Sequence, residues 1–135
     1  MVGVVSFHGG GAVLVYILVG GVLGTLARYG LQGLIQAKAG TSFPTGTLVV
    51  NLTGSLVLGF VMRWATGSTV LSPELRAGLT IGFCGAYTTM STFGYETWTL
   101  LAVQDYARAA LYAGLTLVGC VGAVAVGATL AHRVL

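Results

Sequence analysis

The sequence predicts an all-α membrane protein that forms a single domain over residues 1–135, with four transmembrane helices. Only 7% of the residues are charged, whereas a soluble domain has about 25%. Hydrophobic residues make up 56% of the chain, and the 22 glycines are about twice the usual share, as in closely packed membrane helices. At about 20 residues per span, four helices use most of the chain.

The first two spans are expected at residues 12–34 and 45–64. Residues 13–27 contain no charge, and the stretch up to residue 34 is long enough to cross a bilayer. Lys38, Gly40 and Pro44 then provide loop chemistry before the second apolar stretch begins. Asn51 lies well inside that second span.

The third and fourth spans are expected at residues 75–101 and 107–130. A polar turn at residues 66–74 precedes the third span. Gln104, Asp105 and Arg108 mark the turn between the third and fourth spans. An even number of spans places both chain ends on the same side of the membrane.

The positive charges are divided equally between the two sides that these spans define. Three lie with the termini and three lie opposite, namely Arg63, Arg76 and Arg133 against Arg28, Lys38 and Arg108. The positive-inside rule therefore gives no clear orientation. We expect copies to insert both ways and to pair antiparallel, since so small a protomer needs a partner to enclose a polar path. The alternative is a weak but real orientation bias.

The middle of the third span is too polar and too rich in glycine for contact with lipid. Gly82 and Gly85 lower helix propensity, and the hydroxyl groups that follow offer other partners to the backbone. We expect a helix break near residues 85–88, with the freed carbonyl groups facing protein or a cavity. A small cation such as Na⁺ would satisfy such carbonyls. The alternative is a continuous helix whose threonine hydroxyls bond to the preceding turn.

Polar side chains and aromatic rings recur at helical spacing on the third and fourth spans, and all of them except Glu96 are uncharged. Thr89, Thr92 and Glu96 form a stripe at helical spacing, with Met90 and Phe93 beside it. Such groups offer hydrogen-bond donors and ring edges to a partly dehydrated anion. A similar set on the other spans consists of Asn51, Tyr112, Thr116 and Cys120. The alternatives are an interhelical hydrogen bond for Asn51, and core packing for Met90 and Phe93.

Composition and spacing argue against several other functions. The acidic residues Glu74, Glu96 and Asp105 are not placed as a catalytic pair, so an enzyme is not expected. The scattered basic residues do not form a nucleic-acid-binding run. Cys84 and Cys120 lie in apolar stretches without zinc-ligand spacing, and a disulfide is not indicated.

Three segments resemble the Fluc/CrcB family of fluoride channels. The segments are GTLARY at residues 24–29, GTLVVNLTG at residues 46–54 and GFCGAYTTMSTF at residues 82–93. The last segment is similar to the family pattern G-F-x-G-x-x-T-T-F-S-T-F and departs from it only at Met90, where the family has Phe. The resemblance covers most of the chain.

This resemblance implies an antiparallel, dual-topology homodimer in the cell (inner) membrane that passively exports fluoride through two pores and lowers its cytoplasmic concentration. It also implies a structural, untransported sodium ion at the dimer centre, held by the backbone carbonyls of Gly85 and Thr88. Asn51 would be a pore amide and Phe93 a ring position, with Met90 at the other ring position. The hydroxyl track would contain Tyr112, Thr116 and Cys120.

Arg28 matches the family's arginine at the end of the first span, where it would attract anions at a vestibule or extend to the membrane interface. Two other functions remain open at this point. A small multidrug-type exporter would need a membrane carboxylate on its first helix, and residues 12–34 contain none. A non-transporting membrane assembly subunit would leave the hydroxyl stripe unexplained. The preference for fluoride over chloride, the conduction rate and gating do not follow from the sequence.

Overall fold

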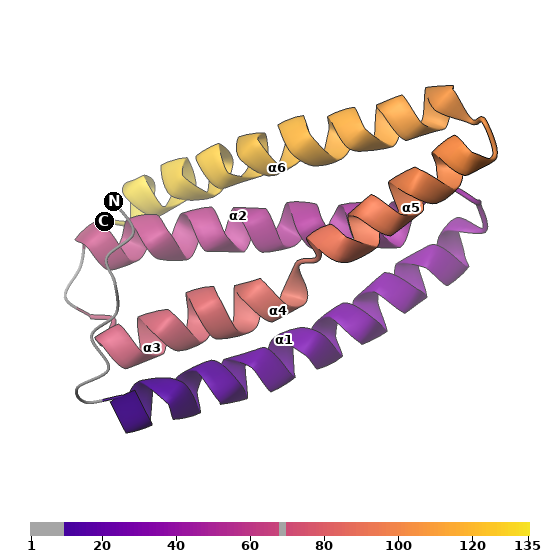
Figure 1. Cartoon of the computed structure of the whole chain (residues 1–135). Helices are drawn as coiled ribbons and strands as arrows, with labels where there is room; N and C mark the ends of the chain where they lie inside the picture. The colour runs from indigo at the N-terminus through magenta and orange to yellow at the C-terminus, as the bar shows by residue number, and fades with distance from the viewer. Residues whose placement is uncertain (1–9, 68–69) are drawn as a thin grey trace.

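The computed structural model describes residues 10–67 and 70–135, and all the regular structure in this part of the chain is helical. The bundle contains three long helices and one divided segment (Figure 1). The divided segment follows the second long helix along the chain, has two halves, and is called the third segment below. In order, the elements are α1 (Gly10–Ala39), α2 (Thr45–Gly67), α3 (Pro73–Ala77), the π-helix η1 (Gly78–Cys84), α4 (Gly85–Tyr87), α5 (Met90–Ala102) and α6 (Tyr106–Val134).

The long helices extend beyond the expected spans. α1 continues past residue 34 to Ala39 and is followed by Gly40, whose φ of 59° is one that glycine adopts without strain. α1, α2 and α6 are each long and apolar enough to cross a membrane. The expectation of an all-helical membrane protein is therefore confirmed. Residues 68 and 69 of the expected turn lie outside the described part of the chain.

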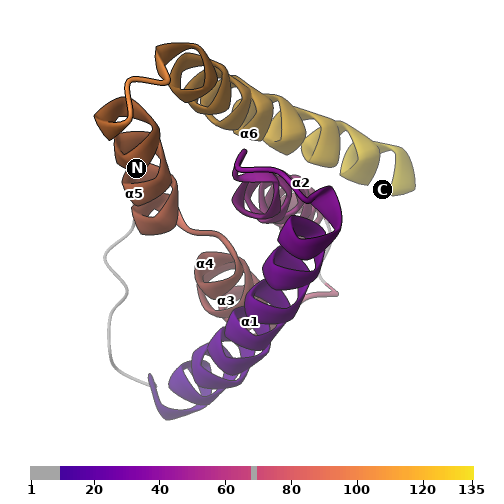
Figure 2. The same ribbon diagram turned by 90° about the vertical axis from the view of Figure 1, so that its right-hand side faces the viewer.

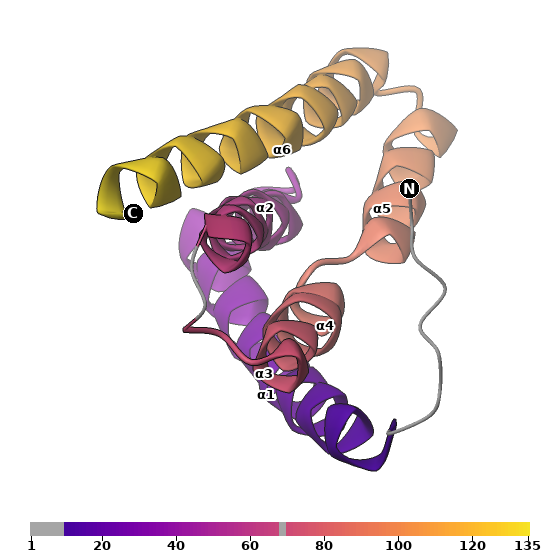
Figure 3. The ribbon, with the colours of Figure 1, turned by 90° about the vertical axis from the view of Figure 1, so that its left-hand side faces the viewer.

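α2 lies at the centre of the bundle, between α1 and α6. The halves of the third segment pack on different neighbours, as the two end views show (Figures 2 and 3). α3, η1 and α4 pack on α1, whereas α5 packs on α6. The start of α1 and the end of α6 lie at the same end of the bundle (Figure 1), as an even number of crossings requires.

Glycines bring the first half of the third segment into backbone contact with α1. Gly20 and Gly24 are buried, and a Cβ atom at Gly24 would lie 2.3 Å from the carbonyl oxygen of Phe83. Gly59 and Gly127 allow a similar approach between α2 and α6. These small faces serve helix packing, because they let the backbones meet closely.

The break in the third segment lies at Thr88 and Thr89, at the C-terminal end of the expected range. Both residues are extended, with φ and ψ of −86° and 159° at Thr88 and −149° and 116° at Thr89. Gly82 lies within the π-helix and Gly85 has α-helical angles, so the extended residues are the first two of the hydroxyl-bearing residues that follow the glycines. β-Branched threonines adopt extended angles readily, and their hydroxyls provide local caps.

Candidate ion pathway beside the helix break

Asn51 on α2 holds the break through two hydrogen bonds to one residue. Its Nδ2 donates to the carbonyl oxygen of Thr89 at 3.1 Å, and its Oδ1 accepts from the Thr89 backbone N–H at 2.8 Å. Both residues are buried. The side-chain amide thus replaces the two backbone partners that Thr89 would have in a continuous helix. This is the interhelical hydrogen bond that the sequence left as an alternative for Asn51.

Two carbonyl groups beside the break have lost the N–H partner that a continuous helix would give them. In a continuous helix the Gly85 carbonyl would accept from Thr89 N–H, but that N–H donates to Asn51. The Thr88 carbonyl would accept from Thr92 N–H, which instead donates to Thr89 Oγ1 at 3.3 Å and caps α5. Gly85 and Thr88 are the residues for which the family resemblance implies a cation.

Thr88 also shows the alternative behaviour considered for the threonines. Its hydroxyl donates to the carbonyl of Cys84 at 3.0 Å, one turn earlier. The Thr89 hydroxyl instead bonds forward, donating to Thr92 Oγ1 at 3.0 Å. The Thr88 hydroxyl thus bonds to the helical turn before the break, and the Thr89 hydroxyl bonds to the turn after it.

A groove of about 380 Å³ lies beside the break, between α2, η1, α4, α5 and α6. Thr116 on α6 lines it and is 5% exposed, and its Oγ1 is buried with no hydrogen-bond partner in the described part of the chain. Thr116 therefore lines the groove with a buried hydroxyl that no described residue pairs with. The other polar or sulfur-containing residues that line the groove are Asn51, Ser55, Thr80, Cys84, Thr88, Thr89, Met90 and Cys120.

Glu96 on α5 joins three helices through a second set of hydrogen bonds. Its carboxylate accepts from Thr47 Oγ1 at 2.8 Å and from the Tyr112 hydroxyl at 2.7 Å. Gln32 on α1 donates to Thr47 Oγ1 at 3.0 Å. The sequence analysis missed Thr47 and Gln32 as members of this network. Thr47 precedes Asn51 by four residues, and that helical spacing was a signal for a shared polar face.

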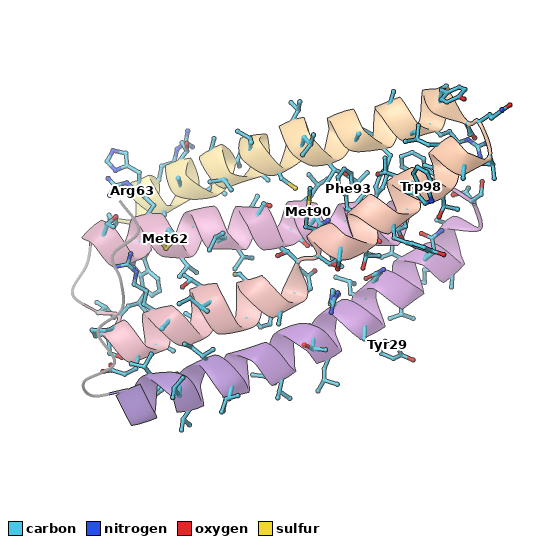
Figure 4. The ribbon with its side chains drawn as sticks, viewed as in Figure 1. Tyr29, Met62, Arg63, Met90, Phe93 and Trp98 are labelled. Carbon is cyan, nitrogen blue, oxygen red and sulfur yellow. The ribbon has the colours of Figure 1, made fainter. Side chains whose placement is uncertain are left out.

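Phe93 and Met90 have different surroundings, although both lie on the side of α5 toward α6 (Figure 4). Phe93 is buried against Tyr112, with ring centroids 5.2 Å apart. Met90 is 68% exposed and lines the groove. Within one protomer, Phe93 therefore packs in the core, which was the alternative to a pore position, whereas Met90 does not.

Arg28 lies away from the break, in a separate groove at the far half of α1. This groove has a volume of about 490 Å³ and is also lined by Tyr29, Gln32 and Gln36. Arg28 is half-buried, whereas Tyr29 is exposed (Figure 4). Gln32 belongs to this groove and also bonds to Thr47, so the Arg28 groove adjoins the Glu96 network.

Together, the apolar helices, the buried break and the polar groups around it define a multi-pass helical membrane protein with a candidate ion pathway. Residues 15–128 match the family described as "CrcB-like protein, Camphor Resistance (CrcB)". The chain belongs to this family.

Two curated relatives show how far the similarity extends. A protein of Geobacter sulfurreducens named "Fluoride-specific ion channel FluC" is 50% identical over 95 residues, which cover 70% of this chain and 77% of the relative. A protein of Methanococcus aeolicus with the same name is 40% identical over 122 residues, covering 90% and 97%. The similarity therefore includes all four helical segments.

Proposed function

We propose that this chain is a fluoride-specific ion channel that passively exports fluoride and so lowers its cytoplasmic concentration. The names of its curated relatives support this function, and they describe channels rather than enzymes or exporters. Fluoride and membrane lipid are then its partners. Export from the cytoplasm places the channel in the cell (inner) membrane.

The observation that carries the conduction path is the buried hydroxyl of Thr116, which has no hydrogen-bond partner among the residues that the structure describes. A buried hydroxyl without a partner costs about 1–3 kcal/mol, so it indicates a site that is completed by something outside the protein. The first turn of α5 begins in the same groove, at Met90, and the N-terminus of a helix favours an anion. A neutral donor and a helix terminus attract an anion without binding it too tightly to leave.

We infer that the path continues along α6 and α5. Tyr112, Thr116 and Cys120 are spaced by one turn each and provide the track on α6. Thr89, Thr92 and Glu96 provide polar groups on α5, with the Phe93 ring against Tyr112. Arg28 would attract fluoride into the groove at the end of α1, which adjoins the Glu96 network.

A matched pair of valine variants on α6 tests the path. Thr116→Val removes the free hydroxyl, whereas Thr129→Val removes an exposed hydroxyl that bonds to the carbonyl of Ala125 at 2.8 Å. In liposomes, a fluoride-selective electrode should record at least about tenfold slower efflux for Thr116→Val and wild-type efflux for Thr129→Val. Fluoride and chloride are compared in parallel. Well-folded wild-type protein without fluoride flux would reject the function.

Thr116→Val also separates function from folding. Replacing an unsatisfied buried hydroxyl by a methyl group of the same shape should leave stability unchanged or raise it by about 1 kcal/mol. Thermal unfolding in detergent measures this. Loss of flux together with loss of stability would mean that Thr116 has a structural role instead.

We propose that the Gly85 and Thr88 carbonyls hold a structural sodium ion that is not transported. These residues fit a hard cation, because each carbonyl has lost the donor that a continuous helix would give it. Thr89 is not a ligand in this proposal, because its carbonyl already accepts from Asn51. Bound sodium would supply positive charge to these carbonyls.

Replacing Na⁺ with a bulky organic cation tests the sodium site. We expect a lower unfolding temperature and slower fluoride flux, both restored when Na⁺ is returned, because uncompensated carbonyls at membrane depth are costly. The unfolding measurement does not depend on conduction. Unchanged stability after verified removal of Na⁺ would count against the site.

We propose that two copies form an antiparallel homodimer with dual topology. Gly85 is exposed, and an apolar groove between α1 and η1 lies beside it, lined also by Gly21 and Thr25. Carbonyls at an exposed position can be shared by a second copy. The equal numbers of basic residues toward the two ends of the bundle support insertion in both orientations.

Single cysteines test the topology, in a background without Cys84 and Cys120. One is placed at position 70 in the connection between α2 and α3, and a second variant carries it at position 104 in the loop before α6. Each should react with an impermeant thiol reagent in about half of the molecules from either side, because both orientations coexist. Labelling from one side alone would exclude dual topology.

A further inference from the structure

Three sulfur-containing side chains from three different elements meet at the groove beside the break. Cys84 of η1, Met90 of α5 and Cys120 of α6 all line it. The only other sulfur in the described part of the chain belongs to Met62 on α2, which lies outside this groove. Sequence distance conceals this cluster, because 30 residues separate Met90 from Cys120.

The three residues differ in exposure, which gives the cluster a route of entry. Met90 is 68% exposed, Cys120 is half-buried and Cys84 is 2% exposed. Met90 is unbranched, with a flexible thioether that adapts its position to a ligand. Met90 is thus the most accessible of the three residues, and Cys84 is the least accessible.

We propose that Cys84, Met90 and Cys120 form a binding site for a soft monovalent cation of the Cu(I) and Ag(I) class. Thiolate and thioether ligands select such ions over hard cations. On binding, the Cys120 S–H bond breaks, its proton passes to water, and the thiolate forms a bond to the metal. Met90 and the neutral Cys84 thiol contribute lone pairs. One thiolate with one monovalent cation is a neutral complex, which suits a groove at membrane depth.

A second feature of the groove supports a ligand there. Thr116 lines the same groove, and its buried Oγ1 has no hydrogen-bond partner among the described residues. Its oxygen is a hard donor, so it does not compete with sulfur for a soft ion. A metal ion in the groove would, however, occupy the space beside this hydroxyl. The effect on flux therefore rests on the proposed function, whereas the binding itself does not.

Equilibrium dialysis of purified protein against Ag⁺, in nitrate buffer without chloride, tests the site. Elemental analysis should give one Ag⁺ per protomer. Cys84→Ala and Cys120→Ser should each weaken binding by at least about tenfold, which equals about 1.4 kcal/mol. Met90→Leu should weaken it less. The control Met62→Leu removes a sulfur at the other end of α2 (Figure 4) and should bind Ag⁺ like the wild type.

The stoichiometry distinguishes a shared site from separate thiols. The proposal would be overturned if each protomer bound two Ag⁺ ions and each cysteine variant lost one of them. It would also be overturned if Ag⁺ binding were not saturable, or if Met62→Leu weakened Ag⁺ binding as much as the cysteine variants do. In liposomes, bound Ag⁺ should stop fluoride efflux. Bound Ag⁺ with unchanged efflux would overturn the placement beside the path. A wild-type protein that binds Ag⁺ but never conducts fluoride would refute the proposed function and leave the metal site standing.

Discussion

Replacement of Asn51 by leucine tests whether one side chain holds the helix break in place. Leucine has a similar volume but neither donates nor accepts a hydrogen bond, so the Thr89 N–H and C=O both lose their partner. A buried polar group left without a partner costs about 1–3 kcal/mol. Measured hydrogen bonds between membrane helices are weaker, with a maximum of about 1.7 kcal/mol.

Two lost hydrogen bonds should therefore destabilise the fold by about 2–3 kcal/mol. In this range the doubled cost of a buried unpaired group overlaps the doubled value of a hydrogen bond between membrane helices. The matched control is Thr53→Val, on the same helix. It removes one interhelical hydrogen bond of 2.8 Å between the Thr53 hydroxyl and Tyr87, together with the bonds of this exposed hydroxyl to the Val49 and Val50 carbonyls of its own helix. That variant should lose less than about 1 kcal/mol, because hydrogen bonds between membrane helices contribute about 0.6 kcal/mol on average.

Unfolding in detergent gives the total change, and amide hydrogen exchange gives its location. Exchange at Thr89 should accelerate by more than about tenfold in Asn51→Leu, which corresponds to about 1.4 kcal/mol of lost protection. Exchange at residues in the first half of α1 should change less. If Asn51→Leu were as stable as Thr53→Val and its Thr89 amide kept wild-type protection, Asn51 would not be the clamp described above.

Three other substitutions test the packing and the path. Gly24→Ala should destabilise the fold by about 1–3 kcal/mol in thermal unfolding, because its Cβ would overlap the η1 backbone, whereas Gly30→Ala has open space and should be neutral. Tyr112→Phe removes the 2.7 Å hydrogen bond that the Tyr112 hydroxyl donates to Glu96. We expect the free energy of unfolding to fall by about 1.5–3 kcal/mol and fluoride efflux to become slower. Wild-type values of both would contradict the role of the Glu96 hydrogen-bond network. Phe93→Ile should slow efflux while size-exclusion chromatography shows an unchanged assembly, and unchanged efflux would remove Phe93 from the path.

The segments of the fold could be predicted because apolar length is a strong signal. Uncharged runs located the helices, and Gly40 marked the end of the first one. The break was located to within a turn, and the hydroxyl-bearing residues named as one of its two causes include the residues that are extended. Glycine propensity drew attention to Gly85, whereas the structure breaks where Thr89 finds a partner on another helix. Such a partner lies 38 residues away, and local propensity carries no information about it.

The candidate site shows the same division between local and distant information. Helical spacing grouped Thr116 with Tyr112 correctly, because both face inward on α6. The spacing could not show that the hydroxyl of Thr116 lacks a partner, since that depends on every neighbouring helix. The contact between Thr47 and Glu96 joins residues 49 positions apart and was missed for the same reason.

The division of the third segment between two neighbours has a consequence for engineering. Its first half is attached to α1 by backbone contacts at glycines, and its second half is attached to α6 through the Phe93 and Tyr112 rings. Changes made at these two places share no side chain, so their free energies should add. The α6 side can therefore be redesigned, for example to admit another anion, while the α1 side is left as an unaltered scaffold.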